Sequence, residues 1–170
     1  MTKVWLGLGS NRGESLAILH AAIEELRTLL DDLKVSGFWK SRARYYEDQD
    51  DFINAAVSGF TMLDPHELLA RIHAIEAAHG RDRTREFVKG PRTLDIDILL
   101  YGNAVLAEPD LIIPHAGLQE RKFVLLPLLE LDPDLVHPVL ELSLMSIAAS
   151  LPPQGIYPLV DDRYDAPYPQ

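Results

Sequence analysis

Residues 93–101, TLDIDILLY, place two aspartates at alternate positions in a segment that is otherwise largely apolar. Successive side chains of a β-strand point to opposite faces, so Asp95 and Asp97 would share one face of a sheet. The opposite face would carry the aliphatic residues at positions 94, 96 and 98. We expect the aliphatic face to pack on helices. This segment therefore predicts a sheet in which one face is covered and the two carboxylates stand on an open face.

The segments before this strand alternate between strand-like and helical patterns. Residues 3–9 and 35–41 are predicted strands, and so are residues 52–63. Between the first two, leucine and isoleucine recur at helical spacing from Leu16 to Leu30. With a second helix after residue 63, the order is strand, helix, strand, strand, helix, strand. This order predicts an α+β fold, the ferredoxin-like four-stranded antiparallel sheet with helices packed on one face.

The second helix has clear sequence signals at both ends. Asp64 is suited to cap its start, Pro65 to occupy its first position, and Glu67 to complete a capping box. Gly80 is suited to the left-handed conformation that closes many helices. After Gly102 the pattern becomes irregular, and we predict only a short helix at about residues 123–131.

The length and composition indicate one domain with a substantial core. The chain has 170 residues, of which 47% are hydrophobic. We expect a single domain over residues 1–150 and a Pro/Tyr-rich tail over the surface at 151–170. The absence of cysteine excludes thiolate metal sites and disulfides. No segment resembles a signal peptide or a membrane span, so we expect a cytoplasmic protein with no membrane partner.

A basic loop stands out against the acidic composition. The formal net charge is −10, which argues against a general nucleic-acid-binding surface. Five of the 16 lysines and arginines nevertheless lie in one short stretch, namely Arg81, Arg83, Arg85, Lys89 and Arg92. Guanidinium groups bind phosphate oxygens well, and this loop leads directly into the paired aspartates. We expect it to bind a polyphosphate and to close over it.

The paired carboxylates have two possible explanations. Asp95 and Asp97 could be ordinary surface acids, which is the usual explanation for two aspartates at this spacing. The adjacent basic loop favours a second explanation, in which both hold magnesium, a cation that prefers carboxylate and phosphate oxygens. On the strand at 52–63, Phe52 and Asn54 would likewise project together and offer an aromatic surface and an amide to a flat heterocycle. Packing and a turn contact would explain that pair equally well.

Four motifs together carry a specific resemblance. They are Gly9-Ser10-Asn11, the stretch from Asp51 to Ala56, the run GPRTLDIDILLYG, and IPH followed by Arg121 and Phe123. In this order they resemble the hydroxymethyldihydropterin pyrophosphokinase family, over roughly residues 4–140. The resemblance implies transfer of diphosphate from ATP to the 6-hydroxymethyl group of 6-hydroxymethyl-7,8-dihydropterin in folate biosynthesis, with release of AMP.

The resemblance also implies roles for individual residues. Two Mg²⁺ ions would be held by Asp95 and Asp97, and these aspartates with Arg83 and Arg92 would be the catalytic residues. The implied ATP contacts are His73, Glu76, Arg81, Arg83, Arg92, Ile98, His115 and Arg121. The implied pterin contacts are Ser41, Phe52, Asn54, Asp95 and Phe123.

The chain departs from the family pattern in its predicted pterin loop, where residues 41–46 read SRARYY. Ala116 also stands where the family has an aromatic residue. We expect a monomer that binds no nucleic acid. Two other interpretations are open: an RNA-binding module on the same fold, and a catalytically silent relative that binds pterin or nucleotide as a regulator.

Overall fold

The computed structural model describes residues 1–42, 50–80 and 93–159. The basic loop predicted to bind phosphate, with Arg81, Arg83 and Arg92, lies outside these residues, and so does its predicted closure. Among the described residues, no helix is both long and apolar enough to cross a membrane.

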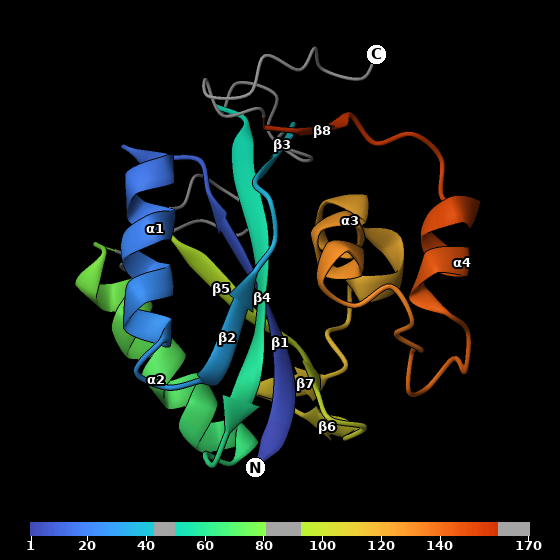
Figure 1. The fold of residues 1–170 in the computed structure, drawn as a ribbon, viewed down its shortest axis with the longest axis horizontal. Helices are drawn as coiled ribbons and strands as arrows, with labels where there is room; N and C mark the ends of the chain where they lie inside the picture. Colours follow the sequence, from blue (N-terminus) through green and yellow to red (C-terminus); the bar gives the residue numbers. More distant parts are fainter. Residues whose placement is uncertain (43–49, 81–92, 160–170) are drawn as a thin grey trace.

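A central antiparallel sheet organises the part of the chain that the structure describes (Figure 1). Its six strands are β1 (Thr2–Ser10), β2 (Asp31–Val35), β3 (Trp39–Ser41), β4 (Phe52–Thr61), β5 (Asp95–Tyr101) and β8 (Ile156–Pro158). The main order is β5-β1-β4-β3-β8, and β2 also pairs with β4. The first strand thus lies between the strand at residue 52 and the strand at residue 95, as expected from the fold class.

The expected four strands became six for two reasons. The predicted strand at 35–41 is divided into β2 and β3, because four residues from Val35 to Trp39 face only three residues of β4. At this irregularity Ser36 Oγ accepts the backbone N–H of Ala56 at 2.8 Å, in place of a regular ladder contact. The second reason is β8, which lies in the segment predicted to be an irregular tail. It pairs with β3 and adds an edge strand to the sheet.

Four described helices cover the sheet on two faces, so the prediction of helices on one face only is wrong. They are α1 (Ser15–Leu26), α2 (Pro65–Ala78), α3 (Lys122–Leu131) and α4 (Leu144–Ser150). Figure 1 shows α1 and α2 on one side of the sheet and α3 and α4 on the other. The second layer forms because Trp5, Ala56 and Leu99 present apolar surface on that face, and residues of α3 and α4 bury it.

The face toward α1 and α2 carries the main core. Leu94, Ile96 and Ile98 are all buried there, as the alternating pattern predicted. The predicted start of α2 is confirmed: Asp64 Oδ1 accepts the Glu67 N–H at 2.9 Å, and Glu67 Oε2 accepts the Asp64 N–H at 2.9 Å. Gly80 follows the helix with a φ of 86°, the left-handed conformation expected of it.

The irregular region after Gly102 contains elements that the sequence did not reveal. Strands β6 (Leu106–Glu108) and β7 (Leu111–Ile113) form a hairpin, and a short 3₁₀ turn (Leu118–Glu120) leads into α3. The predicted helix at 123–131 corresponds to α3. Helix α4 and both hairpin strands were not predicted, because each is too short to show a periodic pattern.

Candidate active site

The pairing of three strands brings the predicted pterin and metal residues into one row. Gly9 on β1 faces Asn54 on β4 and Asp95 on β5, while Gly7 faces Asp97. Residues paired across neighbouring strands point to the same face, so Asn54, Gly9 and Asp95 share a face. Helices α3 and α4 cover the apolar part of this face around Trp5 and leave the two half-buried aspartates accessible.

Gly9 provides free space in this row. A Cβ atom at Gly9 would lie 3.3 Å from Asn54 Oδ1 and 3.7 Å from Phe52 Cδ1. Phe52 and Asn54 therefore do project together, as the alternation predicted. A flat ligand can approach the backbone of β1 between the amide and the carboxylate because no side chain fills the gap.

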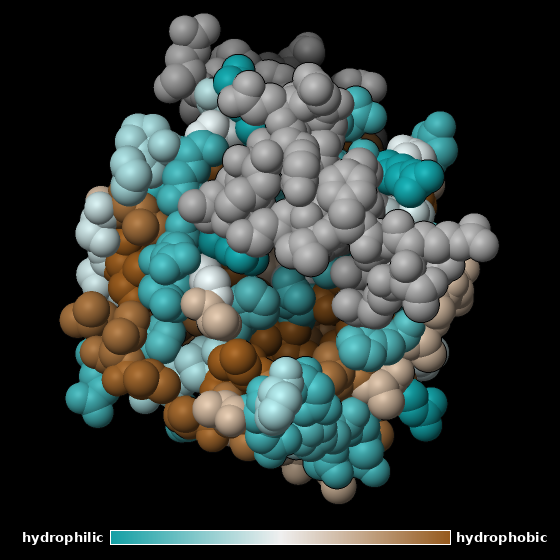
Figure 2. Space-filling view, turned by 180° about the vertical axis from the view of Figure 1, so that it is seen from behind, coloured by the Kyte–Doolittle hydropathy of each residue, from teal (hydrophilic) through white to brown (hydrophobic). Residues whose placement is uncertain are grey.

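A pocket of about 370 Å³ lies at the outer edge of β5, within the size range of small-molecule sites. Figure 2 looks onto this side of the molecule, where polar and apolar residues surround a central recess. Its walls are Leu69, His73, Asp95, Ile96, Asp97, Ile98, Pro109, Asp110, Leu111, Ile112, His115 and Ala116. Five of the predicted residues line it: His73, Asp95, Asp97, Ile98 and His115. Sequence reasoning missed the hairpin residues 109–112, since β6 and β7 gave no detectable pattern.

His115 presents one ring nitrogen to Asp97. Its Nδ1 accepts the Gly117 N–H at 3.1 Å, so the neutral ring carries its proton on Nε2. Nε2 lies 3.7 Å from Asp97 Oδ2. Burial lowers the pKa of His115, the charge of Arg121 lowers it further, and the charge of Asp95 opposes these effects. The neutral imidazole is therefore favoured, and it offers a single N–H donor beside the aspartates.

Glu76 does not line the pocket, contrary to the direct ATP contact that the resemblance implied. Its side chain has no exposed surface, and its carboxylate accepts the Ile96 N–H at 3.0 Å. Strand β5 is at the end of the sheet, so this N–H needs a partner from outside the ladder. Ile96 lies between the two aspartates. Glu76 therefore holds the segment of β5 that carries them.

Replacing Glu76 by alanine should leave the Ile96 N–H buried without this acceptor and lower the free energy of unfolding by about 1–3 kcal/mol. Turnover should fall as well, because β5 would no longer be held by a hydrogen bond between Asp95 and Asp97. Glu76→Gln keeps an acceptor oxygen and is the matched control, expected to retain most of the stability. Chemical denaturation of both variants measures the difference, and equal stability of the alanine variant and the wild type would contradict this role.

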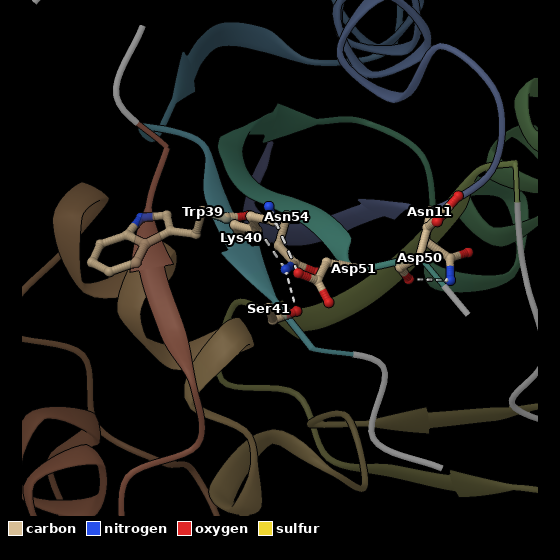
Figure 3. A network of polar contacts seen from close by, with 7 residues as sticks. All are labelled: Asn11, Trp39, Lys40, Ser41, Asp50, Asp51 and Asn54. Atoms are coloured by element: carbon tan, nitrogen blue, oxygen red, sulfur yellow. Dashed lines mark hydrogen bonds and ion pairs between the residues drawn. The ribbon is translucent and has the colours of Figure 1, made fainter. Parts of the chain in front are cut away.

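Asn54 is fixed by contacts on β3 (Figure 3). Its Nδ2 donates to Ser41 Oγ at 2.8 Å and to the Trp39 carbonyl at 3.4 Å, and both Asn54 and Ser41 are buried. The amide nitrogen is thus committed within the protein, whereas the sequence suggested that it would donate to a ligand. The amide oxygen faces the space above Gly9. Ser41 supports Asn54 in this arrangement.

A carboxylate on α3 holds β3 from the other side. Glu130 accepts the Gly37 N–H at 2.8 Å and the Trp39 indole N–H at 2.5 Å. The sequence gave no signal for this contact, because the partners are 91 to 93 positions apart. It fixes the distance between α3 and the strand that bears Ser41.

The start of α3 carries two further predicted residues. Arg121 precedes the helix, and its guanidinium carbon lies 5.9 Å from the centre of the Phe123 ring. Helix α3 packs against β1, β3 and β4, so Phe123 comes from an element next to the row formed by Asn54 and Gly9. Direct contact of Phe123 with the pterin and of Arg121 with ATP stays a prediction.

A second group of chemically active side chains lies at the hairpin. His66 Nε2 is 2.6 Å from Glu108 Oε2, and His66 Nδ1 is 3.7 Å from Asp110 Oδ2. Among the described residues, this trio is close enough to share a metal ion, but all three side chains are exposed. We interpret the contacts as a link that fastens the β6–β7 hairpin, and with it one wall of the pocket, to the first turn of α2.

Taken together, the two carboxylates, the neutral histidine and the pocket define a site for a nucleotide-dependent transferase. Comparison with known proteins specifies the class. The sequence profile of the family described as 7,8-dihydro-6-hydroxymethylpterin-pyrophosphokinase (HPPK) matches residues 5–133. The chain belongs to this family.

Individual relatives agree with this assignment. The chain is 41% identical over 139 residues to a 2-amino-4-hydroxy-6-hydroxymethyldihydropteridine pyrophosphokinase of Aquifex aeolicus, covering 82% of this chain and 86% of the relative. It is 44% identical over 138 residues to the protein of the same name in Methylorubrum extorquens, covering 80% and 86%. It also matches the folic acid synthesis protein fol1 of Schizosaccharomyces pombe, at 41% identity over 154 residues, but spans only 21% of that longer protein.

Solved structures share the fold. A Plasmodium falciparum HPPK-DHPS structure superposes with a TM-score of 0.71 at 16% identity, over 87% of this chain and 43% of that one. The overall α+β architecture is therefore a known one, and the six strands and two helical layers described above replace the simpler arrangement predicted from the sequence.

Proposed function

We propose that this protein transfers the terminal diphosphate of ATP to the 6-hydroxymethyl group of 6-hydroxymethyl-7,8-dihydropterin and releases AMP, as a step of folate biosynthesis. The observation that carries the proposal is the row of Asn54, Gly9 and Asp95 across three strands, with Asp97 facing the adjoining pocket. It supplies neighbouring places for a flat heterocycle and for a nucleotide in a chain of the HPPK family.

The pocket at the edge of β5 would hold ATP. Apolar side chains of α2, β5 and β7 suit the adenine ring, and they are Leu69, Ile98, Leu111 and Ile112. His73 and His115 line the same space, and the His115 Nε2–H can donate to a phosphate oxygen. In this proposal Arg81, Arg83, Arg92 and Arg121 neutralise the triphosphate.

The metal assignment fits the donor set. Asp95 and Asp97 offer hard carboxylate oxygens on one strand face, the kind of ligand that magnesium takes together with substrate phosphates. Two Mg²⁺ ions held there would neutralise charge on the transferred diphosphate. The remaining work of the site is positioning, and Glu76 contributes by fixing β5 between the two ligands.

The pterin would lie over Gly9, with Phe52 beside it and the Asn54 amide oxygen available to accept from a ring N–H. In this proposal Ser41 keeps the amide in place, and Phe123 supplies a second ring surface. The hydroxymethyl oxygen would then lie toward Asp95. Its attack on the β-phosphorus forms the new O–P bond, breaks the bond from that phosphorus to the oxygen that leaves with AMP, and releases the hydroxyl proton.

The test is formation of AMP from ATP in the presence of magnesium and 6-hydroxymethyl-7,8-dihydropterin. We expect AMP and the pterin diphosphate in equal amounts, dependent on both substrates and on magnesium. Binding of both substrates with no AMP would instead identify a silent regulator. Gel filtration tests the further proposal that the enzyme is a monomer, and we place its reaction in the cytoplasm, where its substrate ATP is available.

A further inference from the structure

The C-terminal segment at residues 154–159 links two parts of the site that the chain otherwise places far apart. Strand β8 pairs with β3, with Ser41 opposite Ile156 and Trp39 opposite Pro158. The Leu159 N–H donates to the Phe38 carbonyl at 2.7 Å and extends the contact. Without β8 the three-residue strand that bears Ser41 would be the exposed edge of the sheet.

The residue just before β8 caps helix α3. Gln154 Oε1 accepts the Lys122 N–H at 2.9 Å, and Gln154 Nε2 donates to the Glu120 carbonyl at 2.9 Å. The first N–H groups of a helix have no partner inside it, and the N-cap residue Arg121 makes no capping contact with its own side chain. The cap is supplied by a glutamine 32 positions further along the chain.

These contacts close a circuit around the pterin side of the site. Gln154 holds the first turn of α3, Glu130 ties α3 to Trp39, and β8 joins β3 to the strand that follows Gln154. Arg121 and Phe123 flank the capped position, and Ser41 lies on the strand that β8 covers. The circuit thus fixes residues of α3 relative to residues of β3.

We infer that Gln154 is a positioning residue, which sets the placement of Arg121 and Phe123 against the pterin-binding strands through its cap on α3. The segment that carries it lies beyond residues 5–133, the part of the chain matched by the family profile. The inference rests on the proposed function for the identity of the ligands. The contacts themselves do not depend on it.

Three variants test the inference. Gln154→Ala removes both side-chain contacts, while Gln154→Glu keeps an acceptor for the Lys122 N–H. Gln119→Ala removes a neighbouring glutamine side chain and serves as the control. For each we would measure pterin affinity by calorimetry with magnesium and a non-hydrolysable ATP analogue, thermal unfolding without ligands, and hydrogen exchange of the Lys122 amide.

We expect Gln154→Ala to weaken pterin binding about fivefold, the scale of removing one helix cap, and to speed exchange at Lys122. Gln154→Glu should restore both to within about twofold of wild type, and Gln119→Ala should change neither. Unchanged pterin affinity in Gln154→Ala would overturn the inference, and so would a loss of thermal stability that the glutamate variant does not rescue. Failure of the wild-type protein to form AMP would instead overturn the proposed function, while exchange at Lys122 would still test the cap.

Discussion

Replacing either Asp95 or Asp97 by alanine should lower kcat/KM about 100- to 1,000-fold or more, the scale seen when one contact to developing charge is removed. Both carboxylates stand on the accessible face of β5, opposite the buried Leu94, Ile96 and Ile98. Their loss removes the proposed magnesium ligands without opening a cavity in the core. Steady-state kinetics with varied magnesium would measure the effect, and circular dichroism would verify the fold.

Asp134→Ala is the matched control for this experiment, since it removes an exposed carboxylate from a loop outside the pocket. Its activity should stay within about twofold of wild type, because an isolated surface charge contributes little. Near-normal turnover in the Asp95 or the Asp97 variant would refute the two-metal assignment.

Asn54→Ala should weaken pterin binding about 5- to 150-fold, which corresponds to roughly 1–3 kcal/mol for removal of a buried hydrogen-bonding group. ATP binding should change little, because Asn54 does not line the pocket at the edge of β5. Separate titrations of each ligand by calorimetry would measure the two effects. Equal losses for both ligands would show that Asn54 does not recognise the pterin.

Ser41→Ala separates direct recognition from support. It removes the hydroxyl that accepts from Asn54 Nδ2 and leaves the amide oxygen in place. We expect a smaller loss of pterin affinity than for Asn54→Ala, since the Trp39 carbonyl still accepts from the amide. If Ser41→Ala weakened binding by as much as Asn54→Ala, the orientation of the amide rather than its oxygen would be the main contribution.

Several features of the fold could be predicted because they depend on neighbouring residues. The alternation in β5 placed Asp95 and Asp97 on one face, and local capping chemistry set the start of α2 at Asp64. Phe52 and Asn54 were likewise assigned to one face of β4 from the two-residue period of a strand. The family resemblance then connected these separate segments to one activity, and the match of the family profile confirms the family.

Other features depend on contacts between distant parts of the chain. Nothing in the local sequence showed that α3 and α4 would cover the second face of the sheet, because this layer forms only when Trp5, Ala56 and Leu99 come together from three strands. The residues of the β6–β7 hairpin line the pocket for a similar reason. Their place depends on packing beside β5 rather than on any pattern of their own.

The sequence by itself thus determined which residues share a face, where α2 begins, and to which family the chain belongs, since all three depend on short-range periodicity or on motif order. Only the tertiary structure decided the functions of Glu76 and Gln154. A carboxylate or an amide can cap any backbone group that lacks a partner, and which group that is depends on where the sheet ends and how the helix is seated. In this protein those groups are the Ile96 N–H at the edge of β5 and the Lys122 N–H at the start of α3.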